Sequence, residues 1–501
     1  MTSRAAASAR AITFLICGTL FAARARADAE LRVPSTFAYA EPGEENRLRA
    51  LLELTGVYAV GFTFYLATNR LLPEYDVHYS WPVLREKLLG AGFELDINGL
   101  NTNFVGHPLG GSMYYTMARS NGLNVAESTA FAFGGSLLWE LFGEVREYIS
   151  SNDMIVTPLA GLALAEPMFQ LGAFFDRSSP RLHNRVLGVI FAPVKTLNDW
   201  LDGRKLARTL TPDAGGFPAD EYHRFDLRAG TAAVVQGPAT GFPQVHRTFE
   251  ARISLASQLI RLPDYDRAGR HSLFFADANV SSVEIDAAIN GTGLVDLEIH
   301  SWVAIAGYYL RRAQQARGQG TLVSVAMGYQ YVLHDYDRDR PWPRDRFASI
   351  QPLALVIEHR RNRDQLTWTT HVEGGLDFGG LRPYALPAYE RSSDAVMLTT
   401  LVANNAYCFV RGGHLLASLL LTVAQFELAG RVRYERYTGL DLPIDVDDSR
   451  LMLEGRMTLT LADSPARLGL VVQRRHRSGV MAAVQVQRSE LSVGLELGAR
   501  Y

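Results

Sequence analysis

The feature that most constrains this chain is an alternation of apolar and polar residues that returns throughout its second half and runs to the last residue. In the closing stretch SELSVGLELGARY, every second residue from Leu491 to Tyr501 is apolar or aromatic, and the residues between them are small, polar or charged. A period of two is the signature of a strand with one apolar and one polar side. The chain therefore ends on a two-faced strand.

The same period returns from about His246 onward. The runs include TFEARISLAS, TLVSVAMGYQYVLH, QLTWTTHVEGGLDF, QFELAGRVRYERY and RLMLEGRMTLTL. Connectors rich in Pro and Asp, such as HDYDRDRPWPRDR and DLPIDVDDS, separate them and have the composition of turns. Strands of about ten residues joined in this way match a transmembrane β-barrel, so we predict an antiparallel barrel of about 10–12 strands over residues 222–501.

A large soluble sandwich or a lipocalin-like barrel would show the same alternation. Isolated charges on the polar faces suit a wet lumen, and aromatic residues near the strand ends suit a membrane interface. The terminal Tyr501 with its preceding alternation also resembles the C-terminal strand of bacterial outer-membrane proteins. These features favour the membrane barrel, and a secreted soluble β-domain is the alternative.

The first residues have the pattern of a processing segment. Arg4 and Arg10 precede the apolar run AITFLICGTLFAA, and ARA at residues 25–27 offers small residues to a signal peptidase. We therefore predict a signal peptide over residues 1–27. The chain would then leave the cytoplasm and reside in the envelope.

The cysteine content and the net charge limit which modifications and binding partners are expected. Bulky residues before Cys17 disfavour lipid attachment there, and the mature chain keeps Cys408, which cannot form a disulfide within the molecule. With 50 basic and 52 acidic side chains, nothing suggests a nucleic-acid partner. We expect outer-membrane lipid as a partner, envelope proteins as a further option, and no cofactor.

Residues 47–203 change to a helical period. LRALLELTGVYAVGFTFYLA, AESTAFAFGGSLLWELFGEVREYIS and IVTPLAGLALAEPMFQLGAFF have helical length, but charges, Gly or Pro interrupt each. None offers about twenty uninterrupted apolar residues, so none is a convincing membrane span. We predict a helical domain over residues 28–211 that faces the periplasm and plugs the barrel or docks onto envelope partners or lipid, followed by a linker over residues 212–221.

The most unusual stretch is NTNFVGHPLGGSMYYTMARSNG, which covers residues 101–122. Pro108 and the glycine pair that follows it predict a tight turn that opens a short helix. Downstream, SLLWELFGEVREYISSND sets Glu140 and Glu144 four residues apart, which places both carboxylates on one helix face. The two stretches together are the best candidate for a polar site.

These motifs occur in a recognisable order: N-x3-H-P-x2-G with two tyrosines and an arginine, then W-E-x3-E, then S-x-D before Thr-Pro. The set resembles the bacterial family catalogued as domain of unknown function 3943, over about residues 101–166. The resemblance implies no known activity, so no catalytic residue is carried over. It supports one structural unit that contains Asn103, His107, Pro108, Arg119, Trp139, Glu140, Glu144 and Asp153.

A histidine with two carboxylates at helical spacing could provide general acid/base chemistry or bind a metal. The candidate catalytic residues are His107, Glu140 and Glu144. A polar cluster for binding or structure comprises Asn101, Asn103, Tyr115, Arg119, Trp139 and Asp153. We favour the plainer interpretation, in which Arg119 neutralises Glu140 or Glu144 and His107 caps a turn, and we assign no metal ligand.

The standard catalytic signatures H-E-x-x-H, G-x-S-x-G, C-x-x-C and the P-loop are absent from the sequence. The histidines of the second half are expected to be polar lumen or loop residues: His246, His300, His334, His371 and His414. The preferred function is therefore a non-enzymatic barrel of a Gram-negative outer membrane. The alternative in a different class is a lipid- or envelope-directed hydrolase that uses His107 with Glu140 and Glu144.

Overall fold

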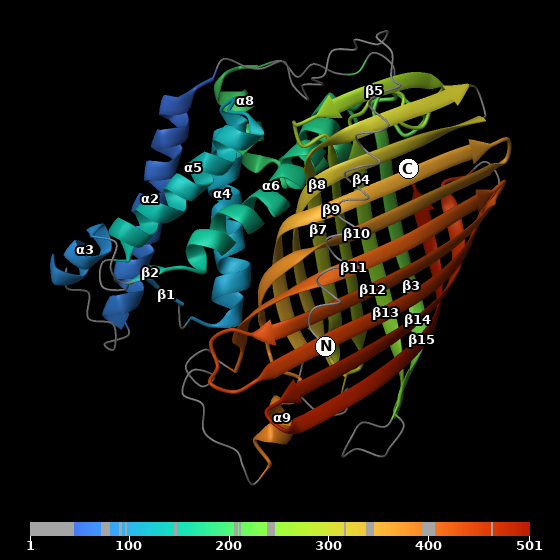
Figure 1. Cartoon of the computed structure of the whole chain (residues 1–501). Helices are drawn as coiled ribbons and strands as arrows, with labels where there is room; N and C mark the ends of the chain where they lie inside the picture. The colour runs from blue at the N-terminus through green and yellow to red at the C-terminus, as the bar shows by residue number, and fades with distance from the viewer. Residues whose placement is uncertain are drawn as a thin grey trace, which may run out of the picture. The chain divides into compact units, whose positions relative to one another are not determined.

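The second half of the chain closes into an antiparallel β-barrel in this computed structural model (Figure 1). Twelve strands form the ring, pairing of β7 with β8 closes it, and β5 pairs with the far end of β7 as an additional strand. The strands are β3 Tyr222–Gln236, β4 His246–Ile260, β5 Gly269–Phe275, β6 Val280–Asn290, β7 Gly293–Gln314, β8 Arg317–His334, β9 Asp345–Arg363, β10 Leu366–Leu381, β11 Cys408–Val423, β12 Phe426–Gly439, β13 Val446–Thr460, β14 Ala466–Met481 and β15 Val484–Arg500. The predicted antiparallel barrel is confirmed.

The structure describes residues 45–71, 81–89, 93–95, 98–144, 148–204, 209, 212–237, 246–314, 317–336, 345–392, 406–461 and 464–501. The predicted signal peptide lies outside these residues. The helices and the barrel belong to one compact unit, Thr36–Tyr501.

The two ends of the barrel differ in their connections. At the terminal rim, where β3 begins and β15 ends, only residues 364–365 separate β9 from β10 and only residues 424–425 separate β11 from β12. The opposite end, the loop rim, has longer connections, among them residues 335–344 and 382–407. The contrast is partial, because the loop rim also has the two-residue turns 291–292 and 482–483, and the terminal rim has the long connection 261–279 that includes β5. In bacterial outer-membrane barrels the short turns face the periplasm and the longer loops lie at the other end.

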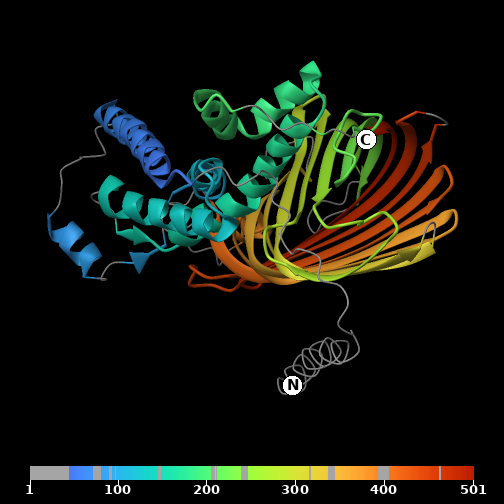
Figure 2. The same ribbon diagram turned by 90° about the horizontal axis from the view of Figure 1, so that it is seen from above.

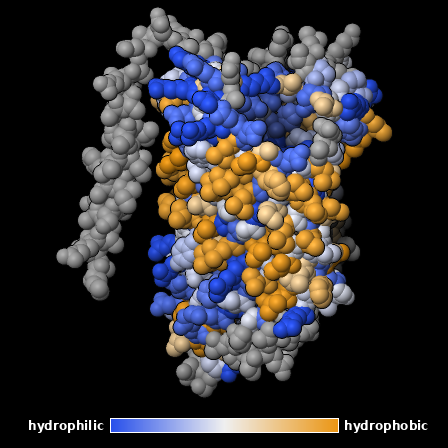
Figure 3. Space-filling model, turned by 90° about the vertical axis from the view of Figure 1, so that its right-hand side faces the viewer, coloured by the Kyte–Doolittle hydropathy of each residue, from blue (hydrophilic) through white to orange (hydrophobic). Residues whose placement is uncertain are grey.

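The alternation along each strand separates an apolar exterior from a polar interior. On β15, the side chains of Leu495 and Leu497 are 62% and 67% exposed, whereas Glu490 on the other face is 3% exposed. The face turned away from the helices has a hydrophobic band across its middle, with hydrophilic residues above and below it (Figure 3). The predicted assignment of the two faces of the closing strand is therefore correct.

The first half is helical and gathers on one side of the barrel, as Figures 1 and 2 show from two directions. The helices are α2 Arg47–Leu71, α3 Trp81–Leu88, α4 His107–Ser120, α5 Val125–Leu138, α6 Asp153–Arg177, α7 Leu182–Phe191 and α8 Pro193–Leu201. Two π-helical turns, η1 Thr102–Gly106 and η2 Trp139–Gly143, flank them, and β1 Phe93–Glu94 pairs in parallel with β2 Ile149–Ser150. The expected helical region before the barrel is confirmed.

Helix α6 lies against the outer surface of the barrel wall. Near the loop rim, Val156 and Ala160 pack with outward-facing side chains of β8 and β9. Further along, the Ser301 hydroxyl of β7 donates to the Ala163 carbonyl at 2.7 Å. Toward the terminal rim, Phe174 meets Phe225 at the start of β3, with ring centroids 5.4 Å apart. The helix therefore crosses the wall from one rim to the other.

This placement argues against the expectation that the helices plug the barrel. Side chains that point into the lumen, such as Trp302, Gln330 and Arg433, meet other barrel residues. Side chains that meet the helices, such as Ser301 and Ile350, lie on the other face of the same strands. Within the described ranges the bundle covers part of the exterior, and the barrel's own residues fill the interior.

Close packing of α4 on α6 depends on glycine. A Cβ atom at Gly111 would lie 1.7 Å from the Thr157 carbonyl oxygen, and one at Gly161 would lie 2.5 Å from the Gly111 carbonyl carbon. The glycine pair was predicted to form a turn before the helix, but it lies within α4, where Gly111 lets two backbones touch. The turn prediction is therefore wrong, because helix contact and not chain reversal requires the missing side chain.

Gly111→Ala should destabilise the bundle by about 1–3 kcal/mol through overpacking, because neither backbone can move without disturbing the wall contact. Gly110→Ala is a matched control, since no heavy atom lies within 4 Å of its Cβ position. It should stabilise by about 0.5–1 kcal/mol, as Ala does over Gly in helices. Thermal unfolding of the purified protein in detergent, followed by helical circular dichroism, measures both; equal melting temperatures would contradict the packing argument.

Candidate functional site

The barrel interior is closed near both ends by apolar clusters. At the loop rim, the short helix α9, Leu386–Tyr389, folds inward and packs on Phe347 and Tyr437. At the terminal rim, Tyr265 in the connection after β4 turns inward, with its ring 4.7 Å from that of Tyr222 and 6.3 Å from that of Tyr309. Both clusters are buried, so apolar side chains from the connections pack into the barrel near each end.

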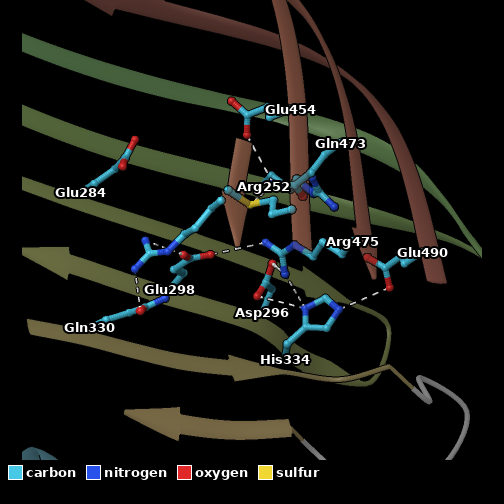
Figure 4. Close-up of polar contacts among 12 residues, drawn as sticks. Arg252, Glu284, Asp296, Glu298, Gln330, His334, Glu454, Gln473, Arg475 and Glu490 are labelled. Atoms are coloured by element: carbon cyan, nitrogen blue, oxygen red, sulfur yellow. Dashed lines mark hydrogen bonds and ion pairs between the residues drawn. The ribbon is translucent and has the colours of Figure 1, made fainter. Parts of the chain in front are cut away.

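Between the caps lies a layer of paired charges, drawn in Figure 4. The Arg475 guanidinium from β14 lies 2.8 Å from Asp296 and 3.7 Å from Glu298 on β7, across the lumen. His334 sits between two carboxylates, with Nδ1 3.1 Å from Asp296 and Nε2 3.3 Å from Glu490. These contacts tie the walls of the barrel together.

The same pattern repeats along the interior. Arg433 donates to Glu435 and to Gln330, each at 2.6 Å. The buried Arg477 donates to Asp345 at 3.0 Å and to Asp448 at 2.6 Å. A buried charge is tolerated when it is paired and hydrogen-bonded, and these arginines meet that condition with two partners each.

Three histidine side chains lie close to the Glu373 carboxylate. Glu373 on β10 lies 3.2 Å from His414, 3.4 Å from His371 and 3.9 Å from His300. The Nδ1 atom of His414 lies 2.7 Å from Asp377. The expectation that these histidines are polar lumen residues is met for His300, His334, His371 and His414, whereas the side chain of His246 lies outside the described set.

A cavity of about 70 Å³ remains beside this layer, lined by charged residues of both signs, among them Arg252, Glu284, Glu298, Arg431 and Arg456. Such a volume holds a few water molecules and no organic solute. Within the described residues, no group of three or more His, Cys, Asp and Glu side chains is arranged to hold a metal ion. This part of the interior can therefore hold water molecules among charges of both signs.

The polar cluster predicted in the helical region divides into two parts. In the first, Arg119 of α4 pairs with Glu166 of α6 through bonds of 2.8 and 3.0 Å. The Tyr115 hydroxyl donates to Glu166 at 2.7 Å, and the Gln170 amide donates to it at 2.9 Å. The fully buried Glu166 is thus surrounded by donors. Arg119 was expected to neutralise Glu140 or Glu144, and that expectation is wrong.

The second part lies at the opposite end of the bundle. His107 at the start of α4 has Nε2 3.4 Å from the Asp153 carboxylate at the start of α6. The Glu140 carboxylate accepts the Ser150 backbone N–H at 2.9 Å, and the Glu144 carboxylate accepts the Trp139 indole N–H at 3.1 Å. The structure thus pairs His107 with Asp153 and gives Glu140 and Glu144 separate structural contacts.

Contacts with the barrel wall hold η1 in place. The Asn103 amide donates to the Tyr407 hydroxyl at 2.8 Å, and Tyr407 donates to the Asn98 carbonyl at 3.0 Å. Tyr329 of β8 donates to the Phe104 carbonyl. Asn101, the remaining member of the predicted cluster, is exposed.

Sequence reasoning missed two contributors to this unit. The buried Lys87 of α3 donates to the Glu140 carbonyl at 2.5 Å and the Glu144 carbonyl at 2.6 Å, and no motif pointed to it. The sequence does contain a signal for Glu166, which lies inside the apolar stretch LALAEPMF. If that helix is buried, the carboxylate requires a positively charged partner. Its partner could not be chosen without the helix packing.

Arg119→Ala should cost about 3–5 kcal/mol of stability, because it leaves the Glu166 carboxylate buried without its cation. Arg185→Ala, at an exposed position on α7, is the control for loss of a surface arginine and should change stability by less than about 0.5 kcal/mol. Melting temperature in detergent measures both variants. If the Arg119→Ala variant has the same melting temperature as the parent protein, the Arg119–Glu166 ion pair does not stabilise the fold.

Comparison with known proteins supports the resemblance found in the sequence. Residues 92–194 match the family described as Domain of unknown function (DUF3943), which spans η1, η2 and the whole polar cluster. No curated protein matches the chain.

Several solved barrels are similar in fold. The translocator domain of autotransporter NalP from Neisseria meningitidis is 9% identical, with a TM-score of 0.19 over 56% of this chain and 88% of that one. The P. putida toluene transporter TodX is 7% identical, with a TM-score of 0.22 over 56% and 90%. The anion-selective porin from Comamonas acidovorans is 6% identical, with a TM-score of 0.21 over 56% and 100%. At these TM-scores the similarities carry no information on function.

Proposed function

We propose that this chain is an integral protein of the Gram-negative outer membrane whose barrel is a sealed anchor for the helical bundle and has no diffusion pore. The observation that carries the proposal is the combination of an apolar exterior with a charge-paired interior that is capped near both ends. An outward apolar face excludes water only if something apolar covers it. The described barrel has no second protein layer over β12–β15, which leaves lipid as the cover.

The closed ring supports a membrane location on independent grounds. In hydrocarbon every backbone N–H and C=O must find a partner inside the protein, and an open sheet edge would violate this rule. Pairing of β7 with β8 removes the two edges that a twelve-strand sheet would otherwise expose. A soluble sandwich has no comparable need for closure, so the secreted β-domain is the weaker alternative.

The sealed interior supports a structural role for the barrel. Paired charges such as Arg475–Asp296 and Arg477–Asp345 cross-link strands that lie across the lumen, and the Tyr265 and α9 clusters lie near its two ends. The hydrolase that uses His107 with Glu140 and Glu144 is the weaker alternative, because the described histidine contact is with Asp153, and the described carboxylate contacts of Glu140 and Glu144 are with the Ser150 backbone and the Trp139 indole. We infer that the barrel holds the bundle in place and that the bundle provides the docking surface toward lipid.

Leu495→Arg places a charge on the outward face of β15 and should destabilise the barrel by about 2–4 kcal/mol if that face meets the bilayer centre. Leu440→Arg, in the turn after β12 at the loop rim, should cost about 0–1 kcal/mol. The measurement is folding efficiency into lipid vesicles, read as heat-modifiable migration on a gel. Equal folding of the two variants, or parent protein in the soluble periplasmic fraction, would contradict the membrane location.

Planar bilayers test the sealed lumen. The parent protein should give no stable conductance steps, because side chains fill both mouths. Arg433→Ala combined with Arg475→Ala should produce steps, since the carboxylates left behind repel one another and draw in water and cations. Arg436→Ala, which removes a cation from an exposed pair with Asp447 at 2.7 Å, is the matched control and should stay silent. Steady conductance of the parent would refute the sealed barrel.

A further inference from the structure

Helix α2 presents a face without charge to its surroundings. The sequence contains no Asp, Glu, Lys or Arg from Leu54 to Asn69. The exposed residues of that stretch are Thr55, Gly56, Ala59, Val60, Phe62, Thr63 and Ala67, and the Val60 side chain is 72% exposed. A surface helix in water carries charged or strongly polar residues on its outer face. The outer face of α2 therefore has the composition of a surface that meets an apolar medium.

The two threonines on this face satisfy their hydroxyl groups within the helix. Thr55 donates to the Leu51 carbonyl at 2.8 Å, and Thr63 donates to the Ala59 carbonyl at 2.6 Å. A hydroxyl in water gains little from this bond, because solvent competes for it. In hydrocarbon this bond satisfies the hydroxyl donors of both threonines, which would otherwise lack a partner.

Charges collect at the ends of the helices. At one end, Arg49 pairs with Asp202 at 2.6 Å, and Arg47 pairs with Glu127 at 2.8 Å. The Arg49 hydrogen bond also lowers the pKa of the Asp202 carboxyl, so this pair stays ionised. At the other end lies the His107–Asp153 pair. A charge-free outer face on α2 between two charged ends of the bundle is the pattern expected of helices that cross a bilayer.

Hairpin α7–α8 is amphipathic with the polar side turned inward. Lys195 is buried and pairs with Asp176 at 2.7 Å and with Asp199 at 2.6 Å. The exposed residues include Leu182, Val186, Val189, Ile190, Leu197, Trp200 and Leu201, of which Leu182 and Trp200 are 78% and 74% exposed. Arg181, His183 and Arg185 are also exposed at the start of α7. A helix pair that exposes apolar residues together with basic ones and a Trp fits the membrane interface.

The barrel wall sets the depth of the bundle. Helix α6 runs from Val156 and Ala160, beside the loop-rim ends of β8 and β9, to Phe174, beside the start of β3 at the terminal rim. Its 25 residues give a length of about 37 Å, which exceeds the roughly 30 Å hydrocarbon core and allows for tilt. If the barrel spans the membrane, a bundle fixed along this path occupies the same layer.

We propose that the helical bundle lies within the outer membrane beside the barrel, with lipid acyl chains covering the outer face of α2 and with α7–α8 at the periplasmic interface. This inference rests on the membrane location of the barrel and replaces the sequence-based expectation of a periplasm-facing domain. The charge-free face of α2 and the apolar exterior of the barrel have the same chemistry, so one partner, the acyl chains, can cover both surfaces.

Single-cysteine variants of the full chain test the depth of α2. Cys408→Ala removes the buried native thiol of the mature chain. Cysteine is then introduced at Val60 on the exposed face of α2, at Leu495 on the barrel exterior, and at Glu45 just before α2. Each variant is reconstituted in phosphatidylcholine vesicles and reacted with a charged maleimide, and a fluorophore on the same cysteine is quenched with nitroxide-labelled phosphatidylcholine.

Val60→Cys and Leu495→Cys should both react at least about tenfold more slowly than Glu45→Cys, because a charged reagent is excluded from hydrocarbon. Both should also be quenched by the acyl-chain nitroxide. Fast labelling at Val60 with protection at Leu495 would overturn the embedded bundle and leave the membrane barrel standing. Fast labelling at both positions would overturn the membrane barrel itself. Protection at Val60 without quenching would mean that a second copy of the chain covers α2, and the proposal would fall.

Discussion

Closure of the sheet between β7 and β8 is the constraint on which the rest of this structure depends. A strand with an apolar outer face can lose its water only when its backbone groups are paired on both sides, and a closed ring meets that condition for every strand at once. Closure then turns the polar face of each strand inward. The charged side chains on those faces are buried away from bulk water, so they form ion pairs with one another, such as Arg475 with Asp296 and Arg477 with Asp448.

The alternation that identifies the strands is a local property, which is why the two faces of β15 could be predicted from SELSVGLELGARY. The pairs inside the lumen are not local. Arg475 and Asp296 face each other because strand tilt and closure bring β14 opposite β7, and neither quantity is encoded in a ten-residue window. The sequence therefore indicates which residues face inward, but it does not indicate which of them form pairs across the lumen.

In the helical region the order of the motifs correctly identified one structural unit. The assumption that Glu140 and Glu144 lie on one continuous α-helix was wrong. Glu140 and Glu144 share a face only if the helix continues, but the π-helical turn η2 covers Trp139–Gly143 and Glu144 lies beyond its end. The wider turn separates two side chains that four-residue spacing would align. Arg119 meets Glu166, a partner that only the contact of α4 with α6, through Gly111 and Gly161, brings within reach.

That contact also bears on how helices could reach an outer membrane. By length and composition, α6 is the single described helix that could cross a membrane, and its centre carries Glu166, Pro167 and Gln170. A stronger span would be held in the inner membrane during export. In α6 the polar centre weakens the isolated helix, and Arg119 and the barrel wall satisfy it only after folding. Its fitness for lipid is thus a property of the assembled fold.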